Sequence, residues 1–159
     1  MSQLAAGPAA RTVLSSPRDS GRLDRDWLPV LAGVPLFGEL SRRHLKRVAS
    51  LAKTRRFASD TAIVRAGDVG AAFYVIIDGS ARVVTSKGRP RRLKAGHFFG
   101  EMALLDDSPR SADVVAESEV LTLTISRSAF AKLLKTEPAI ANALLRTLAA
   151  RLRAAETSS

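Results

Sequence analysis

Apolar residues recur with a helical period in the first ordered part of the chain. After Ser41, whose hydroxyl suits a helix N-cap, apolar side chains fall at positions i, i+3, i+4 and i+7. These positions are Leu45, Val48, Ala49 and Ala52. The opposite face carries the basic residues Arg42, Arg43, Lys46 and Arg47. The pattern predicts an amphipathic helix with one buried stripe, within a helical region expected to span residues 28–53.

The period shortens between residues 54 and 125, where short β-branched and aromatic runs alternate with turn signals. The run from Phe73 to Ile77 leads into Asp78-Gly79, a dipeptide that favours a tight hairpin turn. Other strand-like runs are residues 63–65, 81–85, 91–93, 114–116 and 120–125, with further turns at 66–68 and at Lys87-Gly88. Closely spaced strands with turns between them predict a small β-sandwich or β-barrel.

Helical periodicity returns between residues 126 and 155. Ser126 or Ser128 can cap the first helix, and Pro138 suits the first turn of the last one. The last helix carries an apolar stripe with spacings of 4, 3, 4 and 3: Ala141, Leu145, Leu148, Leu152 and Ala155. The stripe fits two arrangements equally well, one in which it packs on its own barrel and one in which it pairs with a second copy.

These segments together predict one α+β domain over residues 27–159, an antiparallel β-barrel flanked by N-terminal and C-terminal helices. Residues 1–26 have mixed charges and many small residues without an apolar period, so we expect a disordered leader.

Composition narrows the chemistry. The 159 residues include 46% hydrophobic residues, which is typical of a folded domain, and no cysteine, which excludes disulfides and thiolate sites. With only two histidines, His44 and His97, a multi-histidine metal site is not expected. The net charge of +10 suits anionic partners, although a solvated basic surface explains it as well. No apolar run approaches the roughly 20 residues that span a bilayer, and no secretory signal is evident, so we expect a cytoplasmic protein.

The segment 96–112 carries the most informative chemistry. Gly96 and Gly100 permit close approach of the backbone to a ligand, and Glu101 begins a run of helix formers long enough for one turn. The free N–H groups at the start of such a turn suit an anion. Arg110, placed after Pro109 at the entry to an apolar strand, would be partly buried and would need an anionic partner such as a phosphate.

The sequence Phe99-Gly100-Glu101-Met102-Ala103-Leu104-Leu105, followed by Pro109-Arg110-Ser111-Ala112, resembles the phosphate-binding cassette of the cyclic nucleotide-binding domain family. That family includes the sensory domains of catabolite activator proteins, the regulatory subunits of cyclic-AMP-dependent kinase, and cyclic-nucleotide-gated channels. The resemblance covers residues 34–155, with the cassette at 98–112, and implies a jelly-roll-like barrel.

By position, the resemblance implies that Glu101 accepts a hydrogen bond from the ribose 2′-hydroxyl and that Arg110 pairs with a phosphate oxygen. The backbone N–H groups of Ala103 and Ser111 would donate to the phosphate, and Gly100 would lie against the ribose. The expected ligand-binding residues are therefore Gly100, Glu101, Met102, Ala103, Arg110 and Ser111. A structural salt bridge between Glu101 and Arg110 is the alternative interpretation of the two charges.

Ser111 stands where the family has Ala, Ser or Thr. In this family Thr or Ser there sometimes accompanies a preference for cGMP, but the same serine also occurs in bacterial cAMP sensors. The resemblance therefore implies cAMP as the expected ligand, with cGMP as the alternative. Two positions depart from the family pattern. Asp60 replaces a turn glycine, and Asp tolerates left-handed backbone better than most residues. His97 replaces an acidic residue before Phe98, where a surface loop position is expected.

The resemblance implies a non-enzymatic sensor without cofactor or metal, in which ligand phosphate organises the cassette, Leu104 or Leu105 repacks, and residues 138–155 close over the base. The output would pass to an effector protein or to a homodimer through the C-terminal helix, without membrane contact. The alternatives are a metal-dependent barrel enzyme, a nucleic-acid or protein-binding adaptor using the basic face at 41–56, and a scaffold that has lost its ligand.

Overall fold

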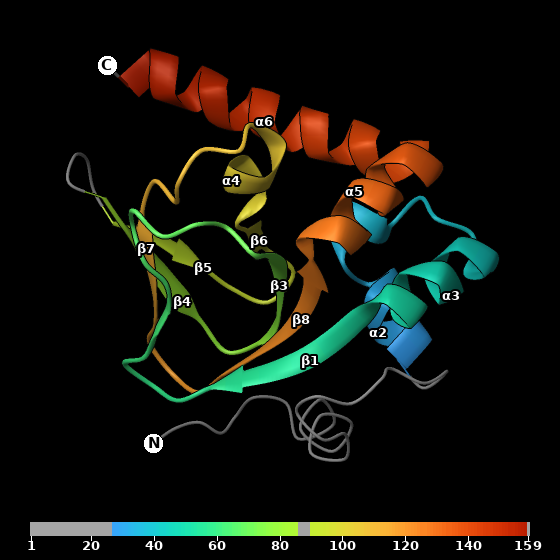
Figure 1. Cartoon of the computed structure of the whole chain (residues 1–159), viewed down its shortest axis with the longest axis horizontal. Helices are drawn as coiled ribbons and strands as arrows, with labels where there is room; N and C mark the ends of the chain where they lie inside the picture. Colours follow the sequence, from blue (N-terminus) through green and yellow to red (C-terminus); the bar gives the residue numbers. More distant parts are fainter. Residues whose placement is uncertain (1–26, 86–89, 159) are drawn as a thin grey trace.

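The computed structural model describes residues 27–85 and 90–158, and its elements alternate between helices and strands (Figure 1). In chain order, the first of these elements are α2 (Leu28–Ala32), the 3-10 helix η2 (Pro35–Phe37), α3 (Arg42–Leu51), β1 (Ala52–Phe57), β2 (Ala62–Val64), β3 (Ala72–Asp78) and β4 (Ala81–Val84). They continue with β5 (Arg91–Leu93), β6 (Phe98–Phe99), α4 (Glu101–Leu105), β7 (Asp113–Ala116), β8 (Val120–Ser126), α5 (Arg127–Thr136) and α6 (Pro138–Ser158). The expected leader at 1–26 and the expected turn at Lys87-Gly88 lie outside the described residues.

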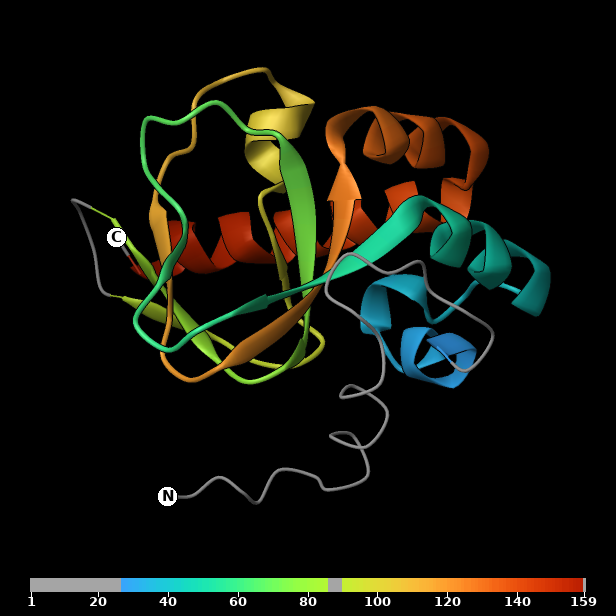
Figure 2. The same ribbon diagram turned by 60° about the horizontal axis from the view of Figure 1, so that its bottom comes forward.

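The described strands form two four-stranded antiparallel sheets, with orders β1-β8-β3-β6 and β2-β7-β4-β5. Helices α2, α3 and α5 gather at one side of the strands, and α6 begins beside α5 and extends from there across the barrel, past the cassette helix α4 (Figures 1 and 2). The expected α+β class, an antiparallel jelly-roll-like barrel with helices at both ends of the chain, is confirmed.

Strand β3 explains why the first sheet is apolar on both faces. Side chains of a strand point alternately to opposite sides. Phe73 and Val75 belong to the core shared with the helices. Tyr74 and Ile76 belong to a second core, between the two sheets. The run from 73 to 77 is therefore continuous rather than alternating, because helices cover one face and the other lines the barrel interior.

The predicted hairpin turn at Asp78-Gly79 is present. Asp78-Gly79 joins β3 to β4, with Gly79 at φ +92°. Asp60 adopts a left-handed backbone with φ +69°, so the aspartate supplies the conformation that glycine would otherwise provide.

Helix α3 has the predicted cap and stripe. The Ser41 hydroxyl accepts a hydrogen bond from the backbone N–H of His44 at 3.3 Å, and Leu45 and Val48 are buried. The expected helical region to residue 53 is two residues too long, because Ala52 is extended and pairs with Ile125 in β1. The alternation of strand β1 therefore begins before the boundary at 54 that the sequence indicated.

The last helix begins at Pro138 as predicted, but its buried stripe differs from the predicted one. Ile140 and Leu144 are buried and Leu148 is partly buried, whereas Leu145 is 63% and Leu152 is 61% exposed. The interpretation in which the predicted stripe packs on its own barrel is therefore wrong for Leu145. The contact face is rotated because Ile140 and Leu144 join the core formed by the helices and the first sheet.

A buried carboxylate connects α3 to the junction of the last two helices. Glu137, only 2% exposed, lies between α5 and α6. Its Oε1 lies 3.4 Å from His44 Nδ1 and its Oε2 lies 3.2 Å from Arg47 Nε. Two residues of α3 thus hold the point at which α6 begins.

Among the described helices, none combines the length and hydropathy needed to cross a membrane.

Candidate functional site

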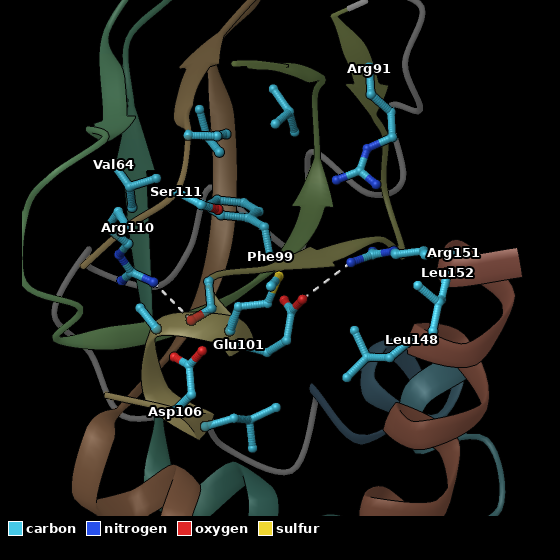
Figure 3. Close-up of a pocket in the computed structure, with 17 residues that line it drawn as sticks. Val64, Arg91, Phe99, Glu101, Asp106, Arg110, Ser111, Leu148, Arg151 and Leu152 are labelled. Carbon is cyan, nitrogen blue, oxygen red and sulfur yellow. Dashed lines mark hydrogen bonds and ion pairs between the residues drawn. The ribbon is translucent and has the colours of Figure 1, made fainter. Parts of the chain in front are cut away.

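A cavity of about 550 Å³ lies between the barrel, α4 and α6 (Figure 3). This volume is within the range of small-molecule sites. All six expected ligand-binding residues line it: Gly100, Glu101, Met102, Ala103, Arg110 and Ser111. The structure thus brings together every residue that the sequence assigned to ligand binding. Within residues 27–85 and 90–158, no three carboxylate or histidine side chains group closely enough to hold a metal ion.

Arg110 is held rigidly in the cavity wall. Its side chain is 7% exposed, and Nη1 donates to the Gly100 carbonyl at 2.8 Å while Nη2 donates to the Ala72 carbonyl at 2.7 Å. Burial, followed by repulsion from Arg127, lowers the pKa of Arg110, against the raising effects of Tyr74, Glu101 and Asp68. A guanidinium has five N–H donors, so these two bonds leave donors for an anion in the cavity. Its desolvated charge favours such an anion.

Two glycines allow the cassette to approach Arg110. A Cβ at Gly100 would lie 2.8 Å from Arg110 Nη1, and the backbone there has φ +93°. A Cβ at Gly70, in the loop between β2 and β3, would lie 2.7 Å from the Ala103 Cβ and 3.3 Å from Arg110 Cζ. Glycine is therefore required at both positions for close packing, and at Gly100 also for backbone conformation.

Glu101 faces the cavity from the first turn of α4. It is 3% exposed, and its Oε2 lies 3.2 Å from Arg151 Nη1 of α6. Within the described residues, Glu101 Oε1 is buried and accepts no hydrogen bond. A buried acceptor without a donor is unfavourable, so this oxygen has an unmet capacity to accept a hydrogen bond.

The alternative salt bridge between Glu101 and Arg110 is not formed. Glu101 pairs with Arg151 instead, and Arg110 binds backbone carbonyls. Arg151 also lies 5.0 Å from the centre of the Phe98 ring and donates to the Phe98 carbonyl at 3.4 Å. A residue of the last helix thus contacts the cassette directly.

Arg127, the first residue of α5, braces the cassette from behind. Its Nε and Nη2 donate to the Gly70 carbonyl at 3.0 and 2.8 Å, and Nη2 also donates to the Ala103 carbonyl at 3.1 Å. Its Nη1 pairs with Asp107 Oδ1 at 2.8 Å. This side chain therefore ties α5 to the loop and to the helix that flank Arg110.

The remainder of the cavity wall is mostly apolar. Phe99 stacks on Tyr74 with ring centres 4.9 Å apart and an interplanar angle of 10°. The other side chains that the sequence reasoning did not assign to the site are Val64, Val83, Arg91, Phe99, Leu105, Asp106, Ala112, Val114, Leu148, Arg151 and Leu152. Leu148 and Leu152 belong to the stripe predicted in the last helix, which was expected to close over the base, whereas Arg151 of the same helix was not singled out.

Comparison with known proteins agrees with this geometry. The family model of the cyclic nucleotide-binding domain matches residues 54–137. The chain belongs to the cyclic nucleotide-binding domain family. It is 37% identical over 123 residues to a cyclic nucleotide-gated potassium channel of Rhizobium etli, covering 77% of this chain and 34% of the channel. It is 36% identical over 104 residues to a cAMP-dependent protein kinase regulatory subunit of Hypocrea atroviridis, covering 65% of this chain and 22% of that protein.

A solved structure shares the fold. The regulatory domain of Toxoplasma gondii PKA, crystallised with cAMP, matches with a TM-score of 0.70 and 28% identity, covering 79% of this chain and 49% of that chain. The chain spans about a third or less of the length of the curated relatives named above, since it covers 34% and 22% of them. The relatives thus have further segments that this sequence does not match.

Proposed function

We propose that the chain is a regulatory module that binds a 3′,5′-cyclic nucleotide in the cavity, with cAMP as the expected ligand. The observation that carries the proposal is a pair of buried polar groups, a cation and an acceptor, that both face a largely apolar cavity. Arg110 supplies a buried cation with unused donors, and Glu101 supplies a buried acceptor without a donor. A cyclic phosphate fused to a ribose offers both partners, an anion for the cation and a hydroxyl donor for the acceptor.

In this proposal Arg110 and the backbone N–H groups of Ala103 and Ser111 bind the phosphate. The ribose 2′-hydroxyl donates to Glu101 Oε1, and Gly100 lies against the sugar. Met102, whose side chain is 55% exposed, also lines the cavity. The base extends toward the apolar wall and the side chains of α6. The similarity to the regulatory domain of Toxoplasma gondii PKA, crystallised with cAMP, supports the choice of ligand.

We propose that α6 responds to the ligand, since Arg151 links it to Glu101 and Leu148 and Leu152 line the cavity. A ligand that contacts both α4 and α6 binds more tightly when α6 lies against the cavity. It therefore shifts the population toward that arrangement. The exposed Leu145 offers a surface to an effector protein or a second copy. This function requires only binding of the ligand and movement of α6, and no chemical step.

Isothermal titration calorimetry with cAMP and cGMP in parallel tests the proposal. The expected result is saturable binding with one site per chain, and 5′-AMP, which lacks the cyclic diester, binds much more weakly. Amide hydrogen exchange measured with and without ligand is expected to slow over residues 138–157. Absence of binding for both cyclic nucleotides would overturn the function, and unchanged exchange in α6 would overturn the response.

A further inference from the structure

Glu137 lies at the joint between α5 and α6, and its backbone bonds to both helices. Its N–H donates to the Leu133 carbonyl at 2.7 Å, which closes α5, and its carbonyl accepts from the Ile140 N–H at 3.0 Å, in the first turn of α6. Its side chain is only 2% exposed, and a glutamate is almost never fully buried unless it is paired. The carboxylate at this joint therefore depends on the partners that hold it there.

Both partners of the carboxylate come from α3. His44 Nδ1 lies 3.4 Å from Oε1 and Arg47 Nε lies 3.2 Å from Oε2, and the side chains of His44 and Arg47 are 45% and 46% exposed. Among the described residues, neither His44 nor Glu137 has a further ion-pair partner. These three side chains, His44, Arg47 and Glu137, form an α3 clasp that ties a helix before the barrel to the start of α6.

The two basic members of the α3 clasp respond differently to pH. Arginine stays charged in proteins, whereas a histidine gains its charge as the pH falls from about 8 to about 5. Because His44 is half-exposed, it exchanges protons with solvent while it contacts the buried carboxylate. Glu137 thus has one cationic partner at the upper end of this pH range and two at the lower end.

The other charged groups on the helices around His44 are basic. They are Arg42, Arg43 and Lys46 on α3 and Lys132 and Lys135 on α5. Helix α2, the 3-10 helix η2 and the first two turns of α6 carry no titratable side chain, and Glu39, in the loop before α3, is paired with Arg146. In the described part of the chain, Glu137 is therefore the acidic partner that a protonated His44 meets.

A continuous helix connects the α3 clasp to the cavity. Helix α6 extends from α5 across the barrel and past α4 (Figures 1 and 2), and Ile140 and Leu144 fix its first turns in the core. Arg151, about 20 Å from the start of α6 at a rise of about 1.5 Å per residue, pairs with Glu101 at 3.2 Å. The α3 clasp and this cavity contact are formed together in the structure. Holding the start of α6 therefore favours the position in which its later turns meet the cavity.

We propose that the α3 clasp makes the affinity of the cavity for its nucleotide depend on pH. Protonation of His44 gives Glu137 a second cation and stabilises the joint, so α6 lies against the cavity more often and affinity rises as the pH falls. A ligand that binds one arrangement more tightly gains apparent affinity from any contact that populates that arrangement. This inference rests on the proposed function of the cavity and adds a regulatory group outside it.

Calorimetry with cAMP at about pH 8 and about pH 5.5 tests the proposal, because these values bracket the titration of a histidine. Wild-type protein is expected to bind about 3-fold more tightly at the lower pH, as for one partly exposed ion pair. His44→Gln, which stays neutral, is expected to bind equally at both. His44→Lys carries a charge at both, so it is expected to bind more tightly than His44→Gln at about pH 8.

His97→Gln is the matched control, because His44 and His97 are the two histidines of the chain. It is expected to keep the pH dependence of the wild type. Equal wild-type affinity at the two pH values would overturn the proposal. A dependence that persists in His44→Gln, or that disappears in His97→Gln, would do so too, because the titrating group would then lie elsewhere.

Urea unfolding without ligand tests the α3 clasp independently of the cavity. His44→Gln is expected to lower the free energy of unfolding more at about pH 5.5 than at about pH 8, and this difference is expected to vanish in a Glu137→Gln background. An equal effect of His44→Gln at both pH values, or in both backgrounds, would refute the clasp. A wild-type chain that binds no cyclic nucleotide at either pH would refute the function of the cavity, and the unfolding result would still decide whether the clasp forms.

Discussion

The Glu101 carboxylate of α4 and the Arg151 guanidinium of α6 form an ion pair, with Oε2 and Nη1 3.2 Å apart. The pair joins two residues that lie 50 positions apart in the chain and meet at the cavity. It occupies one carboxylate oxygen and leaves the other, Oε1, buried without a donor. The same side chain therefore holds the last helix and offers an acceptor to the ligand.

Glu101→Gln tests this double role. The amide keeps the shape but removes the charge that binds Arg151 and strengthens the bond to a hydroxyl. We expect cAMP affinity to fall about 10-fold or more, because hydrogen bonds to charged groups contribute about 1.5–3 kcal/mol. The loss is expected to be smaller for 2′-deoxy-cAMP, which lacks the donor. Calorimetry with both ligands measures the difference, with Glu119→Gln, an exposed glutamate, as control. Equal losses for the two ligands would contradict a ribose contact.

Arg110→Ala removes the buried cation at the phosphate end. We expect a loss of about 2–5 kcal/mol of binding free energy, as for truncation of one partner of a buried charge pair. Arg110→Lys keeps the charge but cannot reach the Gly100 and Ala72 carbonyls with one planar fork, so it should also bind weakly. Calorimetry and thermal melts separate lost binding from lost folding, and Arg43→Ala, on the exposed face of α3, controls for net charge. Unchanged affinity in both Arg110 variants would remove the arginine from the site.

Gly70→Ala tests how closely the loop between β2 and β3 must approach the cassette. The added methyl would lie 2.7 Å from the Ala103 Cβ, so α4 or Arg110 must shift. We expect a loss of about 1–3 kcal/mol in the free energy of unfolding, typical of overpacking, together with weaker nucleotide binding. At Gly33 the nearest atom to an added Cβ is 3.5 Å away, so Gly33→Ala is the matched control. A Gly70→Ala protein with wild-type melting and affinity would show that the cassette has space to spare.

The cassette could be predicted because its residues are close together in the sequence. Gly100, Glu101, Arg110 and Ser111 lie in one short segment, so the resemblance of that segment to the family's phosphate-binding cassette implied a shared site. The lining of α6 could not be predicted in the same way. Its apolar residues form overlapping stripes, and which one faces the barrel depends on the packing of Ile140.

Arg91 and Arg151 were missed for a related reason. The chain has 25 lysine and arginine residues, and nothing local distinguishes these two from the solvated ones. Only the pairing of β5 with β4 and the rotation of α6 bring them to the cavity. The two cores on opposite faces of β3 could not be predicted either, because a strand that is apolar on both faces shows no alternation of apolar and polar residues.

Arg127 makes two kinds of contact, hydrogen bonds to backbone carbonyls and an ion pair at the surface, and two variants can distinguish their contributions. Arg127→Met removes the donors to the Gly70 and Ala103 carbonyls, whereas Asp107→Asn removes only the partner carboxylate, which is 85% exposed. We expect Arg127→Met to lower the free energy of unfolding by about 1–3 kcal/mol and to weaken nucleotide binding, because both carbonyls flank Arg110.

Asp107→Asn should change the free energy of unfolding by less than about 0.5 kcal/mol, since exposed ion pairs contribute little. Asparagine also tolerates the left-handed backbone at this position, where φ is +60°, so the substitution adds no strain. Urea unfolding followed by far-UV circular dichroism, with titrations in parallel, compares the two variants. An Asp107→Asn protein as destabilised as Arg127→Met would mean that the ion pair, rather than the carbonyl contacts, holds α5 against the cassette.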